Sequence, residues 1–152
     1  MILEQRLAWW SRRQAATILT VAINREGGVM ARIIVIDDEA DLRVLLRQML
    51  EAHGHQVDEA ENGTQALSVL KQRPYDLVIT DVLMPEQDGT AVMKKVPELQ
   101  PKAKVLAISG GGPSVPADWS LKMMKLFGVN GALHKPFDES ALISAVDELL
   151  AT

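Results

Sequence analysis

The sequence contains no cysteine among its 152 residues, which excludes disulfide bonds and thiolate metal ligands. It has no apolar run that approaches the roughly 20 residues needed to span a bilayer as a helix. Lysine and arginine do not cluster, and the formal net charge of −4 argues against a nucleic-acid-binding surface. We therefore expect a cytoplasmic, globular protein that binds neither membranes nor nucleic acids.

The length of the chain and its hydrophobic content of 47% fit a single domain with one sizeable core. Residues 1–29 do not share the pattern of the rest, so we expect an N-terminal extension followed by one domain over residues 30–152. Two interpretations of the extension stay open: it is helical or loosely ordered, or it lies upstream of a natural start at Met30. The helical interpretation rests on apolar side chains at helical spacing, namely Leu3, Leu7 and Trp10.

Two short apolar runs lead into acidic residues. Residues 77–79 read Leu-Val-Ile and reach Asp81 two positions later, and residues 33–36 run directly into Asp37 and Asp38. Short, continuous apolar runs of this kind are typical of fully buried strands. Open α/β sheets place their ligand crevices at the carboxyl ends of the strands. The two runs therefore predict one shared acidic pocket.

From residue 32 onward, segments with strand character alternate with segments of helical periodicity. The predicted strands cover residues 32–36, 56–60, 77–80, 103–108 and 131–134. The predicted helices cover residues 42–50, 63–72, 88–96 and 117–127, with Asn62 as N-cap of the second and Pro97 closing the third. A last helix follows Asp138 as its N-cap and has one apolar face, made of Leu142, Ala145, Val146, Leu149 and Leu150. This alternation indicates an α/β fold: a doubly wound, five-stranded parallel sheet with helices on both faces.

The predicted pocket combines three carboxylates, those of Asp37, Asp38 and Asp81. A single aspartate after a strand is often a turn or cap residue, but three together are harder to explain in that way. Two unit charges about 4 Å apart repel by roughly 4 kcal/mol at an effective dielectric constant near 20. Such a cluster raises pKa values or recruits a cation. Because only oxygen ligands are available there, a hard metal is expected, and Mg²⁺ suits this donor set.

Two more strand ends supply polar groups, because Ser109 follows the fourth predicted strand and Lys135, followed by Pro136, comes after the fifth. A lone loop lysine is usually solvated, but beside acids and a metal it suits a phosphate group. A nucleophilic carboxylate, a divalent metal, a hydroxyl and a lysine together suit phosphoryl transfer. The histidines do not form a metal site and are interpreted as surface or strand residues: His53, His55 and His134.

These residues, in this order, resemble the receiver domain of bacterial two-component response regulators, of the single-domain, CheY-like kind. The resemblance covers about residues 32–151. The motifs that carry it are Ile36-Asp37-Asp38-Glu39, Ala60-Glu61-Asn62-Gly63, Asp81-Val82-Leu83-Met84-Pro85 with Asp88-Gly89, Ser109, and Lys135-Pro136-Phe137. It implies a flavodoxin-like sheet of strand order 2-1-3-4-5.

The resemblance also implies roles for individual residues. Asp81 accepts a phosphoryl group from a histidine kinase or a histidine phosphotransfer protein, and the phosphorylated state alters binding of an output partner, which the sequence does not identify. Asp38, Asp81 and the Leu83 carbonyl bind Mg²⁺ directly, whereas Asp37 acts through water. Lys135 contacts the phosphoryl group, and Ser109 moves to hydrogen-bond it. By this resemblance the protein is not an enzyme, except that it catalyses its own phosphorylation and dephosphorylation.

The sequence departs from the family pattern in three places. The position three before Lys135 is usually aromatic and is Ala132 here, the loop after Ser109 is glycine-rich and longer than usual, and residues 1–29 have no family counterpart. The aromatic switch of the family cannot operate without a ring at position 132. We therefore expect residues 110–119 to respond to phosphorylation and the exposure of Trp119 to change.

Two alternative functions compete with this one. A haloacid-dehalogenase-like phosphatase also uses an aspartate nucleophile with Mg²⁺, but it places a second aspartate two residues later, where this chain has Leu83. A receiver-like scaffold that never becomes phosphorylated is the other alternative, although Asp37, Asp38, Asp81 and Lys135 are all present. A small phosphodonor with Mg²⁺ separates the three: a stable acyl phosphate, rapid turnover, or no reaction.

Overall fold

The computed structural model of the chain describes residues 30–82, 89–109 and 118–152. Its strands are β1 (Arg32–Ile36), β2 (Gln56–Ala60), β3 (Leu77–Asp81), β4 (Lys104–Ser109) and β5 (Gly131–His134). Its helices are α2 (Ala40–Ala52), α3 (Gly63–Leu70), α4 (Gly89–Leu99), α5 (Trp119–Phe127) and α6 (Glu139–Leu150). Among the described residues, none of the helices has the length and apolar character needed to cross a membrane.

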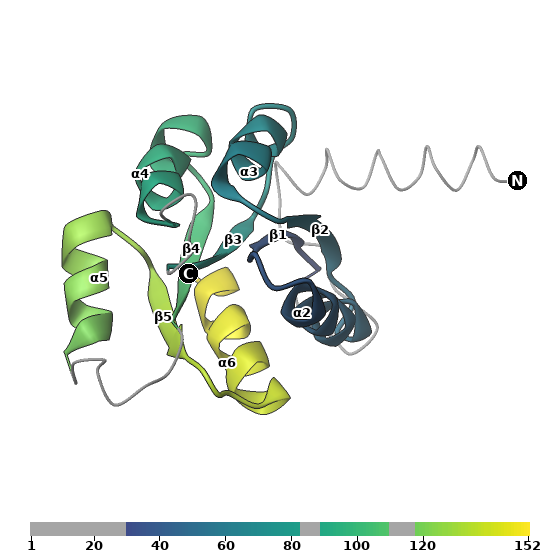
Figure 1. Ribbon diagram of the computed structural model, residues 1–152. Coiled ribbons are helices and arrows are strands. Elements are labelled where there is room, and N and C mark those ends of the chain that lie inside the picture. Colours follow the sequence, from purple (N-terminus) through teal and green to yellow (C-terminus); the bar gives the residue numbers. More distant parts are fainter. Residues whose placement is uncertain (1–29, 83–88, 110–117) are drawn as a thin grey trace, which may run out of the picture.

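The strands form one sheet in the order β2-β1-β3-β4-β5, and every neighbouring pair is parallel (Figure 1). Helices α2 and α6 pack on one face through Leu46, Leu50 and Leu142, and α3 and α4 pack on the other through Leu70 and Met93. This arrangement confirms the doubly wound α/β fold, its strand order and the helices on both faces. Parallel strands require crossover connections, and the helices supply them.

The central strands owe their position to side chains that are apolar on both faces. Ile33 and Val35 of β1 point into the core under α2 and α6, while Ile34 and Ile36 point into the core under α3 and α4. All four are at most 1% exposed. A strand buried on both faces reads as a continuous apolar run, which is the signal that the sequence carried.

The two predicted N-caps are confirmed. The Asn62 side chain accepts a hydrogen bond from the Gln65 N–H at the start of α3, and the Asp138 side chain accepts one from the Ala141 N–H at the start of α6. Gln65 in turn accepts a hydrogen bond from the Glu61 N–H. Each cap satisfies a backbone donor that has no partner within the helix.

Helix α4 corrects one prediction, because it contains Pro97 instead of ending there and continues to Leu99. Proline removes one backbone donor but leaves the next turn able to form, and the Gln100 N–H donates to the carbonyl of Val96. The Gln100 side chain then ties the end of the helix to the connection between α3 and β3, at Leu70, Arg73 and Tyr75. These tertiary contacts, which no local signal reveals, outweigh the cost of the proline.

The interpretation of His55 as a surface or strand residue was wrong. His55 precedes β2, is only 5% exposed, and its Nδ1 accepts a hydrogen bond from the Ala31 N–H. Its backbone N–H donates to the carbonyl of Leu50 in α2. These two hydrogen bonds connect the end of α2 to the residue that precedes β1. Burial lowers the pKa of His55 below its ordinary value. His134 does lie in a strand, β5, as predicted.

Candidate functional site

The three predicted carboxylates meet at the carboxyl edge of the sheet. Asp37 directly follows β1 and Asp81 is the last residue of β3, and the pairing of Ile36 with Thr80 sets these two strand ends side by side. Asp37 and Asp81 are 1% and 4% exposed, whereas Asp38 is exposed. Each of the three offers a carboxylate oxygen, and these oxygens lie within 4.8 Å of one another. The acidic pocket expected from the sequence is present.

Lys135 follows β5 and places its ammonium group between two of these acids. Its Nζ lies 3.1 Å from Oδ2 of Asp81 and 3.4 Å from Oδ2 of Asp37. The side chain is 19% exposed, so the contact is partly shielded from solvent. Its backbone N–H donates to the Ser109 carbonyl at 2.8 Å, and its peptide bond to Pro136 is cis. The lysine is therefore held at the pocket by its backbone as well as by its charge.

Ser109 is the last residue of β4 and is 1% exposed. Asp81 pairs with Ile108 across the β3–β4 ladder, and Ser109 pairs with His134 across the β4–β5 ladder. The hydroxyl-bearing residue thus belongs to the same sheet edge, between the strands that supply Asp81 and Lys135. Leu83, whose carbonyl was expected to bind the metal, lies outside the described residues, as does the glycine-rich loop after Ser109.

The electrostatics of the pocket are those of crowded acids. Burial raises the pKa of Asp37 to about 6, assisted by the charge of Asp81 and opposed by the hydrogen bond from the Glu39 N–H and by Lys135. Burial acts to lower the pKa of Lys135, but its hydrogen bond to Asp81 and the charges of both acids outweigh burial and raise that pKa. One ammonium group cannot neutralise three carboxylates. A divalent cation with a preference for oxygen ligands, such as Mg²⁺, fits this donor set.

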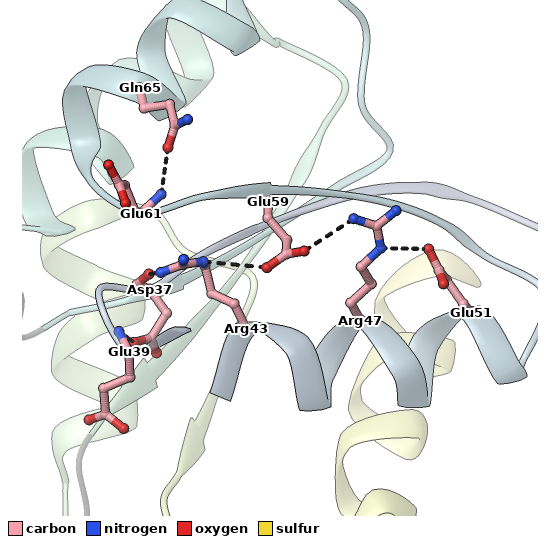
Figure 2. Close-up of polar contacts among 8 residues, drawn as sticks. All are labelled: Asp37, Glu39, Arg43, Arg47, Glu51, Glu59, Glu61 and Gln65. Atoms are coloured by element: carbon pink, nitrogen blue, oxygen red, sulfur yellow. Dashed lines mark hydrogen bonds and ion pairs between the residues drawn. The ribbon is translucent and has the colours of Figure 1, made fainter. Parts of the chain in front are cut away.

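Sequence reasoning missed one contact at the edge of the pocket. Nη1 of Arg43, in the first turn of α2, donates to the backbone carbonyl of Asp37 at 2.6 Å, and its Nε pairs with Glu59 on β2 (Figure 2). In the sequence, an arginine on an amphipathic helix reads as a solvated residue, and nothing local marks it as a partner of the loop before the helix.

Two residues concern the aromatic switch that the sequence lacks: Ala132 on β5 and Trp119 at the start of α5. Ala132 is partly buried on β5 and pairs with Ala107. The Trp119 ring, at the start of α5, lies against the ring of His134, with centroids 4.7 Å apart at an interplanar angle of 57°. Trp119 also packs against the core beneath α3 and α4. An aromatic ring from α5 thus touches β5 two residues after Ala132.

The fold agrees with comparisons to known proteins. The model of the response regulator receiver domain family matches residues 33–147, and this chain belongs to that family. Chemotaxis protein CheY of Bacillus subtilis is 30% identical over 120 residues, which cover 78% of this chain and 97% of that relative. The response regulator receiver protein CpdR of Brucella abortus is 30% identical over 126 residues, which cover 80% and 98%.

A solved structure extends the comparison to three dimensions. The chemotaxis response regulator CheY4 of Vibrio cholerae superposes with a TM-score of 0.70 at 25% sequence identity, covering 80% of this chain and 99% of that one. The chain is thus a CheY-like receiver domain, a phosphoacceptor module of two-component signalling rather than a conventional enzyme. Receiver domains in general interact with histidine kinases and output partners. These findings do not favour the phosphatase alternative.

Proposed function

We propose that Asp81 is the phosphoacceptor of this receiver domain, that Asp38, Asp81 and the Leu83 carbonyl would bind Mg²⁺ directly, and that Asp37 would act on the metal through water. The observation that carries the proposal is the 3.1 Å contact between the Lys135 ammonium and Asp81 inside the acidic cluster. When bound, Mg²⁺ offsets the negative charge of the carboxylates and of the phosphoryl oxygens.

The position of Asp81 favours it over the other two acids as the nucleophile. It ends the central strand of the sheet, with the Asp37–Asp38 pair on the β1 side and Ser109 on the β4 side. Asp37 has one carboxylate oxygen engaged by the Glu39 N–H and the other by Lys135. Asp81 therefore stands where metal ligands flank it on one side and phosphate-binding groups on the other.

The reaction is a transfer between two partners. A carboxylate oxygen of Asp81 attacks the phosphorus of a phosphohistidine, the P–N bond breaks, and the imidazole leaves with the bonding electrons. The Lys135 ammonium stabilises the oxygens of the transferred group, and the Ser109 hydroxyl donates a hydrogen bond to one of them. The donor is a sensor histidine kinase or a histidine phosphotransfer protein in the cytoplasm, and the product regulates binding of an output protein.

The test is incubation of the full chain with acetyl phosphate and Mg²⁺, followed by intact-mass analysis and peptide mapping. We expect one phosphoryl group on Asp81. Rapid phosphate release without a stable adduct would favour a phosphatase, and the absence of any reaction would favour an unphosphorylated scaffold.

The matched control is Asp81→Asn, which keeps the side-chain shape but is not a nucleophile. We expect this variant to take up no phosphate, and its melting temperature to hold or rise slightly, because one charge leaves a repelling cluster. Phosphate on another residue of the variant would count against Asp81 as the sole acceptor.

A further inference from the structure

Arg43 is linked to the acidic pocket through the backbone of Asp37 and not through one of its three carboxylates. It lies in the first turn of α2, and its side chain is only 14% exposed. Its Nη1 donates to the backbone carbonyl of Asp37 at 2.6 Å. A charge-assisted hydrogen bond of this length is among the stronger kinds in proteins.

The Asp37 backbone is held from both sides. Its N–H donates to the Ala60 carbonyl at the end of β2, and its carbonyl accepts from Arg43. That carbonyl belongs to the peptide group that joins Asp37 to Asp38. Arg43 therefore fixes the plane of the peptide from which Asp38 leaves the strand, and so the direction in which the Asp38 carboxylate is presented.

Arg43 is itself held by a chain of charges that runs along α2 (Figure 2). Its Nε lies 3.4 Å from Oε1 of Glu59, which stands on β2. The other oxygen of Glu59 pairs with Nη1 of Arg47 at 3.1 Å, and Nε of Arg47 pairs with Glu51 at 2.8 Å. Glu59 thus forms ion pairs with two arginines from successive turns of the helix, but only Arg43 also donates to the Asp37 carbonyl.

We propose that Arg43 is a positioning residue of the Mg²⁺ site, acting through the Asp37 carbonyl to orient the Asp37–Asp38 pair; this inference rests on the metal site of the proposed function. Groups that orient metal ligands typically change metal affinity by about 10- to 100-fold when they are removed. Arginine suits the task because its planar guanidinium spans two acceptors at once, here a carbonyl and Glu59.

Position and charge predict opposite effects at this residue. A cation near the site repels Mg²⁺, so loss of the Arg43 charge alone should strengthen Mg²⁺ binding. Loss of the orienting hydrogen bond should weaken it. Among variants that remain folded, the sign of the change in Mg²⁺ affinity therefore distinguishes a positioning residue from one that acts only through its charge.

The experiment is calorimetric titration of Mg²⁺ into the full chain, unphosphorylated, at constant pH and ionic strength. Arg43→Met should weaken Mg²⁺ binding by about tenfold or more. Arg43→Lys keeps the charge, but its single ammonium group cannot hold Glu59 and the Asp37 carbonyl together, so it should bind Mg²⁺ more weakly than the wild type. Arg47→Met is the matched control, because Arg47 does not touch Asp37 and pairs with the oxygen of Glu59 that Arg43 does not use. The Arg43–Glu59 pair therefore remains in this variant, and its Mg²⁺ affinity should be unchanged or slightly higher.

Unchanged or tighter Mg²⁺ binding by folded Arg43→Met would overturn the inference. If that variant does not fold, Arg43→Lys decides, and binding equal to wild type would overturn it in the same way. These results leave the proposed function intact. A wild-type chain that binds no Mg²⁺ would instead overturn the metal site of the proposed function together with this inference.

Discussion

At the scale of single residues, the pocket keeps the carboxyl group of Asp37 buried beside a second acid. Asp37 is 1% exposed and faces Asp81 across two strand ends, and the single ammonium of Lys135 is shared between them. The pKa of Asp37 is raised to about 6, with burial as the largest cause. The folded protein thus holds a proton on Asp37 at pH values where the unfolded chain has released it.

This shift predicts how stability depends on pH in metal-free protein. Between the ordinary aspartate pKa of 3.8 and about 6 the folded state binds more protons at Asp37, so the contribution of Asp37 to the free energy of unfolding falls as the pH rises through this window. Asp37→Asn should therefore stabilise the apo-protein increasingly from pH 4 to pH 7, as measured by urea unfolding in EDTA.

Comparing the two proteins at each pH cancels the contribution of His55, which is common to both. The lowered pKa of His55 has the opposite sign, because stability then falls as the pH drops below the ordinary histidine value near 6.5. A difference between wild type and Asp37→Asn that does not change with pH would contradict the prediction.

At the scale of elements, β5 links the pocket to α5. Ser109 pairs with His134, and Lys135 directly follows His134 in the chain. The ring of His134 contacts the ring of Trp119. Ala132 leaves this side of β5 without the ring that the family usually places there. A shift of the backbone at the end of β5 would therefore be transmitted to Trp119 through the contact between the rings of His134 and Trp119.

We predict that phosphorylation of Asp81 changes the fluorescence of Trp119. The phosphoryl group engages Lys135, which shifts the strand end that positions His134 and so alters the surroundings of the Trp119 ring. Replacing Trp9 and Trp10 by phenylalanine leaves Trp119 as the only tryptophan in the chain. Its emission is then recorded before and after addition of phosphodonor and Mg²⁺.

Asp81→Asn in the same background is the control and should give no change in emission. An unaltered spectrum at full phosphorylation, confirmed by mass, would show that β5 and α5 do not report on the pocket. The signal would then have to leave through another element.

The elements also show what sequence alone can and cannot predict. Strands β1, β3 and β4 could be predicted because each is a buried, mainly apolar run, and each ends in or before a polar residue, which placed Asp37, Asp81 and Ser109. Strands β2 and β5 are only partly buried and were predicted from the alternation of strands and helices, which also placed Lys135 after β5. Pro97 was misjudged because its local cost is offset by tertiary contacts of Gln100. The burial of His55 and the reach of Arg43 arise from segments that meet only in the fold.

At the scale of the molecule, the two cores on either face of the sheet are built from residues 31–149, with strands and helices in regular alternation. We predict that a chain without residues 1–29 still folds and accepts phosphate at Asp81, because the described residues from 30 onward supply all five strands and the apolar side chains of both cores. Thermal melts and phosphodonor reactions of the full and shortened chains test this. Loss of a cooperative melt in the shortened chain would show that the N-terminal segment contributes to the core.

The strand order also shows which two strands form the edges of the sheet. Strands β2 and β5 lie at the two ends of the order, and each presents a poor surface for pairing with a further strand. On β2, Asp58 and Glu59 are engaged in ion pairs, while β5 has only four residues and is followed by Lys135 and Pro136. Short, charged or proline-bounded edges disfavour strand addition and edge-to-edge aggregation. A protein that binds this domain is therefore expected to contact its helices and loops instead of adding a strand to the sheet.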